Sequence, residues 1–205
     1  MKLSVWLSSL AMVIGSANTL AATTPLSNFL GCTDQSFPVV TQAPFDKLIS
    51  SVVENGRITL KAGTKSDMGQ RWMFDKPVTV NGLVVTGFFA EDMDIKGSRI
   101  INWGFYSQQT PGQIAALLKT TGVDLPVAGE VLARPEIWSE QHATWQLETS
   151  DATAGKLVAD TSERVLMVEP APEDVAGSHG MLTCSLQGKV SQAALKSSRP
   201  DLLAR

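Results

Sequence analysis

The residues of this 205-residue chain best suited to chemistry are one histidine and three carboxylates. His179 stands in the sequence GSHG (177–180), where glycines let a ligand approach the backbone and imidazole can exchange a proton near neutral pH. Paired with Glu91, Asp92 or Glu173, it could act as the acid or base of a small hydrolase. The competing interpretation is a solvent-exposed turn in which the histidine does no chemistry.

The usual signatures of catalytic and metal sites are missing from the sequence. It contains no G-x-S-x-G, H-E-x-x-H, S-x-x-K, G-x-G-x-x-G or G-x-x-x-x-G-K motif. Only two histidines are present, so a zinc site would need carboxylates or cysteines. The acidic cluster Glu91-Asp92-x-Asp94 is too short for a calcium loop, and Lys96 interrupts it. No metal or other cofactor is therefore expected.

The N-terminus has the order of a secretory signal peptide. Lys2 precedes an apolar run of about 15 residues, shorter than a membrane span, and small residues follow. This order predicts a signal peptide over 1–21, a mature chain from Ala22 or Thr23, a periplasmic or secreted location, and no stable membrane insertion after cleavage. An uncleaved anchor and a lipoprotein, with Leu30-Gly31-Cys32 as the end of a lipobox, are the alternatives.

Export decides the interpretation of the two cysteines, Cys32 and Cys184. An oxidising compartment and an even count favour a disulfide between them, which would close a loop of about 150 residues. Two buried free thiols are the alternative. The chain has no C-x-x-C spacing, so the pair does not have the pattern of a thioredoxin-like redox site.

Bulky rings are concentrated in the sequence NWGFY (102–106). Trp103, Phe105 and Tyr106 are predicted to anchor a partner, because tryptophan and tyrosine carry much of the energy of protein interfaces. In a strand, alternation sends Trp103 and Phe105 to one sheet face and Asn102 and Tyr106 to the other. The alternative role for these rings is core packing.

Two segments carry a helical pattern. Over 44–55, apolar residues recur at spacings of three and four between Pro44 and Gly56, which predicts a helix. Over 110–122, Thr110 and Gln113 have the spacing of a capping box before a second apolar stripe that ends at Gly122. Both segments are expected to cover a sheet.

The remaining pattern is that of short strands. Asn81-Gly82 between runs rich in valine and threonine predicts a hairpin with a type I′ turn. Further strands are predicted over 57–62, 70–74, 99–106, 131–138, 144–148, 164–168 and 181–186. The fold class is therefore α+β, with antiparallel sheets and two covering helices.

A shift of 66 residues aligns two copies of the pattern G-x5-A-G-x8-W, from Gly56 to Trp72 and from Gly122 to Trp138. The region 22–205 is thus either one domain or two similar halves, about 43–108 and 109–188, followed by a C-terminal tail over 189–205. Tandem helix-plus-four-strand units resemble in outline the secreted β-lactamase inhibitor proteins. The resemblance implies a concave sheet surface that grips an enzyme and assigns no functional residue.

These observations favour one function over another. The acidic balance, with a net charge of −3, and the absence of a basic run argue against nucleic-acid binding. A non-enzymatic periplasmic or secreted binding or inhibitory protein, which contacts another protein in the periplasm or outside the cell, is the main prediction. A small secreted hydrolase that uses His179 with a carboxylate is the alternative.

Overall fold

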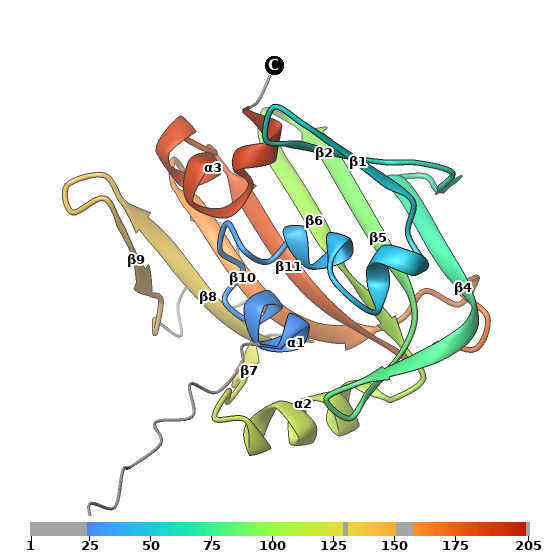
Figure 1. Ribbon diagram of the computed structural model, residues 1–205. Helices are drawn as coiled ribbons and strands as arrows, with labels where there is room; N and C mark the ends of the chain where they lie inside the picture. The colour runs from blue at the N-terminus through green and yellow to red at the C-terminus, as the bar shows by residue number, and fades with distance from the viewer. Residues whose placement is uncertain (1–23, 129–130, 151–157, 204–205) are drawn as a thin grey trace, which may run out of the picture.

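A computed structural model describes residues 24–128, 131–150 and 158–203 (Figure 1). The predicted signal peptide and its cleavage site lie outside the described residues. In the described ranges, no helix is long and apolar enough to cross a membrane. The helical elements are α1 (Pro25–Phe29), η1 (Pro38–Thr41), η2 (Phe45–Lys47), α2 (Pro111–Thr120), α3 (Gln192–Ser198) and η3 (Pro200–Leu202).

The strands form a large antiparallel sheet and a separate hairpin. They are β1 (Ser51–Glu54), β2 (Arg57–Leu60), β3 (Thr64–Lys65), β4 (Gly69–Val80), β5 (Leu83–Ile95), β6 (Ser98–Ser107), β7 (Val127–Ala128), β8 (Val131–Ser139), β9 (Thr144–Leu147), β10 (Ser162–Pro170) and β11 (Gly180–Gly188). Among the described residues the large sheet has nine strands in the order β3-β4-β5-β6-β11-β10-β8-β7, with β9 beside β8. β1 and β2 pair only with each other.

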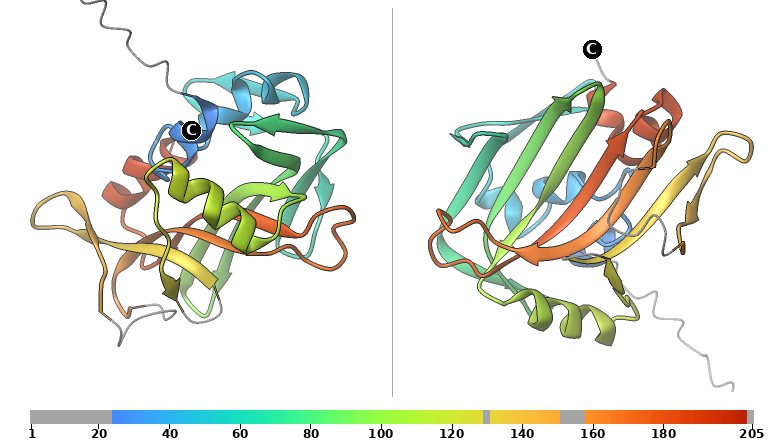
Figure 2. Two further views of the ribbon diagram at one scale, coloured as in Figure 1. Left: turned by 90° about the horizontal axis from the view of Figure 1, so that it is seen from below. Right: turned by 180° about the vertical axis from the view of Figure 1, so that it is seen from behind.

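The sheet is curved, and its two faces differ. The N-terminal segment with α1, η1 and η2, together with α3, lies across one face, here called the inner face (Figure 1). The view from behind shows the opposite, outer face without a helix across its middle, while α2 runs along one end (Figure 2). Most of the core therefore lies between the inner face and the terminal segments.

The inner face is filled by rings from strands and from the N-terminal segment. Phe105 of β6 lies 4.9 Å from the ring of Phe29 and 4.7 Å from the ring of Phe45. Phe88 of β5 meets Phe105 edge-on at 5.3 Å. The N-terminal segment thus completes the core of the sheet.

The predicted disulfide is confirmed. Cys32, which follows α1, is bonded to Cys184 in β11, across a sequence separation of 152 residues. Both cysteines are buried. The bond ties the N-terminal segment to a central strand, and it also occupies the sulfur that a lipoprotein would use for its lipid.

The second predicted helix is confirmed, with its caps. The Thr110 hydroxyl accepts from the backbone N–H of Gln113, whose side-chain oxygen accepts from the backbone N–H of Thr110. Ile114 and Leu118 are buried on one face of α2, and Gly122 follows with a φ of 86°. Local capping and periodicity agree with the tertiary environment here.

The helix predicted over 44–55 is wrong. Phe45 and Ile49 are buried around the single turn of η2, while the chain then extends into β1, where Val52 and Val53 are 38% and 58% exposed. Asn55-Gly56, with φ values of 50° and 79°, forms the hairpin turn between β1 and β2 instead of ending a helix. β-Branched residues beside an Asn-Gly pair favour this hairpin.

The other predicted strands are present with shifted ends. The Asn81-Gly82 turn joins β4 to β5 with φ values of 51° and 86°, as a type I′ turn requires. The strands at 57–62, 70–74, 99–106, 131–138, 144–148, 164–168 and 181–186 correspond to β2, β4, β6, β8, β9, β10 and β11. Sequence reasoning missed β1, β3 and β7.

The fold is therefore mixed α+β and mainly antiparallel, but the duplication is not confirmed. β6 and β11 are paired along their length, so both proposed halves contribute to one sheet rather than to two. The first copy also lacks its helix, which removes the basis of the outline resemblance to the β-lactamase inhibitor proteins. The segment 189–203, predicted as a tail, contains α3 and η3.

Candidate functional site

The predicted catalytic residues are dispersed. His179 is exposed in the loop between β10 and β11, and only its backbone groups are tied down, with its N–H donating to the Ser107 carbonyl at 2.8 Å. Glu91 is buried and accepts from Asn102 Nδ2 at 3.0 Å. Glu173 is exposed. In the part of the chain that the structure describes, no hydrogen bond or ion pair joins the His179 ring to a carboxylate.

Asp92, the remaining candidate, is held in a surface ion pair. Its two carboxylate oxygens accept from Nε and Nη2 of Arg99 at 2.9 and 2.7 Å. The hydrogen bonding of Arg99 to the Asp92 carboxylate, which accepts, is the main reason why the pKa of Arg99 is raised. The described residues contain no group of three or more histidine, cysteine or carboxylate side chains placed to hold a metal ion.

The three rings predicted as partner anchors are buried. Trp103, Phe105 and Tyr106 have exposed fractions of 0%, 1% and 1%. The predicted alternation is correct, since Trp103 and Phe105 belong to the main core and Tyr106 packs with Phe89 in a separate cluster on the outer face. The prediction that these three rings anchor a partner has to be corrected, because the N-terminal segment and the β10–β11 loop cover the rings and leave no accessible area for a partner.

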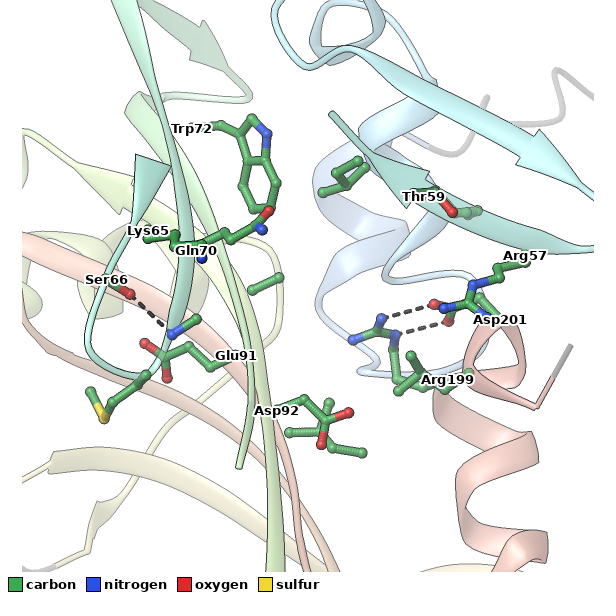
Figure 3. A pocket seen from close by; sticks show the side chains of 17 residues that line it. Arg57, Thr59, Lys65, Ser66, Gln70, Trp72, Glu91, Asp92, Arg199 and Asp201 are labelled. Atoms are coloured by element: carbon green, nitrogen blue, oxygen red, sulfur yellow. Dashed lines mark hydrogen bonds and ion pairs between the residues drawn. The ribbon is translucent and has the colours of Figure 1, made fainter. Parts of the chain in front are cut away.

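A cavity of about 480 Å³ lies between the β1–β2 hairpin, the β3–β4 turn and η3; we call it the hairpin groove (Figure 3). Its polar and charged side chains and its largest ring are labelled in that view: Arg57, Thr59, Lys65, Ser66, Gln70, Trp72, Glu91, Asp92, Arg199 and Asp201. Its volume is within the range of sites that hold small molecules or short peptide segments.

The strand β2 presents its edge to this groove. All residues of β2, Arg57–Leu60, line the cavity, and no residue of β1 does. The Lys61 N–H donates to the Ser50 carbonyl at 2.7 Å, which sets the alternation along the hairpin. Since bonded and non-bonded pairs alternate in antiparallel strands, the N–H and C=O groups of Ile58 and Leu60 point away from β1. Among the described residues, β2 therefore has a hydrogen-bonding edge without a partner strand.

One wall of the groove is fixed by Trp72 of β4. The indole Nε1 donates to the Lys61 carbonyl at 2.7 Å, and the ring is buried. Gly63 allows this approach, because a Cβ at that position would lie 2.7 Å from the indole carbons. These contacts position the end of β2 against β4.

The opposite wall contains a buried ion pair next to η3. Nε and Nη2 of Arg199 donate to the two carboxylate oxygens of Asp201 at 2.9 and 2.8 Å. The guanidinium also lies 3.6 Å from the centre of the Phe37 ring and 5.1 Å from that of Trp103. This pair is neutral as a unit, and its contacts hold η3 against the core.

The charges left over in the groove are mostly positive. Asp92 is neutralised by Arg99, whereas the exposed cations Arg57 and Lys65 have no ion-pair partner among the described residues. Glu91 is the one lining carboxylate without a cationic partner in the same ranges. The groove can therefore attract an anionic ligand.

Comparisons with protein-family models, with curated proteins and with solved structures found no match for this chain.

Sequence reasoning missed the groove, although part of its signal was available. Asn55-Gly56 has the same turn chemistry as Asn81-Gly82, and its recognition would have predicted the β1–β2 hairpin. The spacing between Gly63 and Trp72 forms part of the 66-residue repeat pattern, but its physical basis is the close packing of Trp72 on Gly63. The approach of η3 to β2 had no counterpart in the sequence pattern.

Proposed function

We propose that this protein is an exported, non-enzymatic binding protein that holds an extended, acidic segment of a partner protein in the hairpin groove. The observation that carries the proposal is the free edge of β2 along a groove. An extended segment can add itself to such an edge, because backbone hydrogen bonds supply affinity and side-chain pockets supply specificity.

The backbone groups of Ile58 and Leu60 suit this role. Neither residue pairs with a strand other than β1 in the described part of the chain, and both side chains pack against the main core. The edge is thus supported from one side and open along the groove. A bound segment would satisfy these groups and extend the two-stranded sheet by one strand.

Charge favours an acidic segment. Arg57 lies on β2 and Lys65 on β3, on opposite sides of the groove, and both are exposed. Carboxylates spaced along a bound strand would reach both cations, while apolar side chains would meet Trp72. If the partner needs the bound segment for its activity or for its own assembly, the same contact inhibits the partner. We place this partner in the periplasm or outside the cell.

The proposal can be tested with defined peptides. Short peptides that alternate valine with glutamate, with lysine or with serine would be titrated against the protein by fluorescence anisotropy. We expect the glutamate peptide to bind most tightly and the Arg57→Glu, Lys65→Glu double variant to reverse the preference toward lysine. Equal binding of all peptides, or of none, would refute an acidic segment as the ligand.

A pair of proline variants isolates the backbone contribution. Ile58→Pro deletes an N–H on the groove edge of the hairpin. Val53 is the cross-strand partner of Ile58, and Val53→Pro deletes an N–H that points outward on the far edge of the same hairpin. We expect Ile58→Pro to weaken binding about tenfold, the loss of roughly one hydrogen bond, and Val53→Pro to leave it unchanged. Equal losses in both variants would show that strand addition is not the mode of binding.

A further inference from the structure

A second cavity, of about 540 Å³, lies on the other side of β4 from the hairpin groove. It is bounded by side chains of β4, including Arg71 and Met73, and by the loop 171–179, which runs beside β4 in Figure 1 and in both views of Figure 2. We call it the Arg71 pocket, because Arg71 is the most buried charged group in its lining.

The guanidinium of Arg71 is held at the wall of this pocket. Its side chain is 17% exposed, and Nη1 donates to Asp174 Oδ2 at 2.6 Å. The ring of Tyr106 lies beneath it, with its centre 5.9 Å from the guanidinium carbon. Nε is buried and has no hydrogen-bond partner, so Asp174 is the one carboxylate that neutralises this cation in the described residues.

The position of the Asp174 carboxylate allows a ligand to displace it from Arg71. Asp174 is 69% exposed at the tip of the loop, whereas its neighbour Val175 is buried against Phe89 and Tyr106. The loop itself is anchored by Val175 and by the hydrogen bond between the Thr86 and Ser178 hydroxyls at 2.7 Å. The Asp174 side chain can therefore turn toward solvent without moving the wall of the pocket.

The rest of the lining combines donors with apolar surface. Thr64 lies directly opposite Arg71 in the β3–β4 pair, and Lys65 adds a second cation. Met73 and Phe74 supply apolar surface beside them, and Met73 is exposed. Two cations against one carboxylate leave the pocket with an excess positive charge.

We propose that the Arg71 pocket binds a small organic anion with an apolar body, such as a carboxylate or a sulfonate. The anionic group pairs with the Arg71 guanidinium in place of Asp174 and receives a hydrogen bond from Thr64. The apolar body lies against Met73, Phe74 and Val175. Lys65 lines both this pocket and the hairpin groove, but different residues of β4 and a different loop form the rest of the Arg71 pocket.

The test uses the fluorescent anion anilinonaphthalene sulfonate as the probe and the folded, oxidised protein. Octanoate should displace the probe, whereas octanol, which has the same chain without a charge, and inorganic phosphate, which has charge without a chain, should each be about tenfold weaker or worse. Equal displacement by octanol would reduce the site to an apolar crevice. Equal displacement by phosphate would reduce it to an attraction between charges. Either result overturns the proposal.

Two variants should act in opposite directions. Arg71→Gln should weaken octanoate binding about tenfold, and Asp174→Asn should strengthen it, because the internal competitor loses its charge. The matched control is Arg99→Gln, which breaks an arginine–aspartate pair of similar length outside this pocket and should change nothing. Since Asp174 is exposed, its variant tests the proposal even if Arg71→Gln fails to fold. Unchanged or weaker octanoate binding by Asp174→Asn would refute the site. Ile58→Pro, which tests only the hairpin groove, should leave octanoate binding unchanged.

Discussion

The β1–β2 hairpin and the central strands β6 and β11 are both antiparallel pairs, but different interactions hold them in place. β6 and β11 have neighbours on both sides, β6 carries buried rings, and β11 contains one end of the disulfide. The hairpin pairs with no other strand among the described residues, and it rests on the core through Ile58 and Leu60. An isolated hairpin is marginally stable, so its position depends on these contacts.

Because of this difference, the region that stabilises the fold is not the region that is accessible to a partner. The centre of the sheet has satisfied its backbone groups and buried its largest side chains, so little of it is accessible to a partner. The hairpin keeps an edge that no other described strand occupies, and it exposes Val52 and Val53. The rings in 102–106, which the sequence suggests as an interface, therefore stabilise the fold, while the less conspicuous β1–β2 hairpin is the proposed binding element.

The largest effect should come from the link between the N-terminal segment and β11. Replacing Cys32 and Cys184 by serine should lower the free energy of unfolding by about 5 kcal/mol, because the unfolded chain regains the freedom of a long loop. Chemical denaturation of the oxidised protein and of the variant measures the loss. Mass spectrometry of non-reduced peptides should find the cross-linked pair, and two alkylatable thiols in freshly purified protein would contradict it.

A truncation in each region sharpens the comparison. Phe105→Ala should cost about 4 kcal/mol of stability, because it leaves a cavity between Phe29, Phe45 and Phe88. Val52→Ala, in the exposed part of the hairpin, should change stability by less than about 0.5 kcal/mol. Both values come from urea denaturation curves. Similar losses in the two variants would show that the hairpin is as much a part of the core as β6.

The outer face can be examined through the protein's single tyrosine. Burial beneath the β10–β11 loop is the main reason why the pKa of Tyr106 is raised to about 12, while Arg71 partly opposes this rise. Since the unfolded chain ionises first, the stabilising contribution of neutral Tyr106 is fully present below its ordinary pKa of 10.0 and is lost as pH rises through about 12.

The phenolate absorbance measures this titration directly, because no other tyrosine contributes. We expect a midpoint near 12 in the folded protein and an ordinary midpoint in denaturant. Arg71→Gln should move the folded midpoint further up, since it removes a nearby positive charge. A midpoint near the ordinary value in folded protein would mean that the loop does not cover the ring.

The smallest effect is expected at the exposed end of the same loop. His179→Ala should change the free energy of unfolding by less than about 0.5 kcal/mol, because the ring is exposed and the contacts of this residue are made by its backbone. Thermal denaturation of wild type and variant provides the measurement. A large destabilisation would make His179 a structural residue. Loss of a hydrolytic activity with the fold intact would instead support the alternative prediction of a hydrolase that uses His179.

Much of the architecture was predictable where local chemistry and the final environment agree. The capping box and apolar stripe of α2, the Asn81-Gly82 hairpin and most of the strands depend on turn residues and periodicity within a few positions of one another. The pairing of Cys32 with Cys184 followed from the even cysteine count and the expected oxidising compartment. In each case the sequence itself contains the interaction that selects the structure.

Tertiary structure decided the rest, because the same residues can satisfy two patterns. Phe45, Ile49 and Val53 have helical spacing, but the structure has a short η2 and a strand there instead. Two features favour this outcome: the core buries rings from 24–49, and the chain turns at 55–56. Likewise, an aromatic strand becomes core or interface according to what covers it. That cover comes from an N-terminal segment and a loop far away in the sequence, whose burial of apolar area no local pattern specifies.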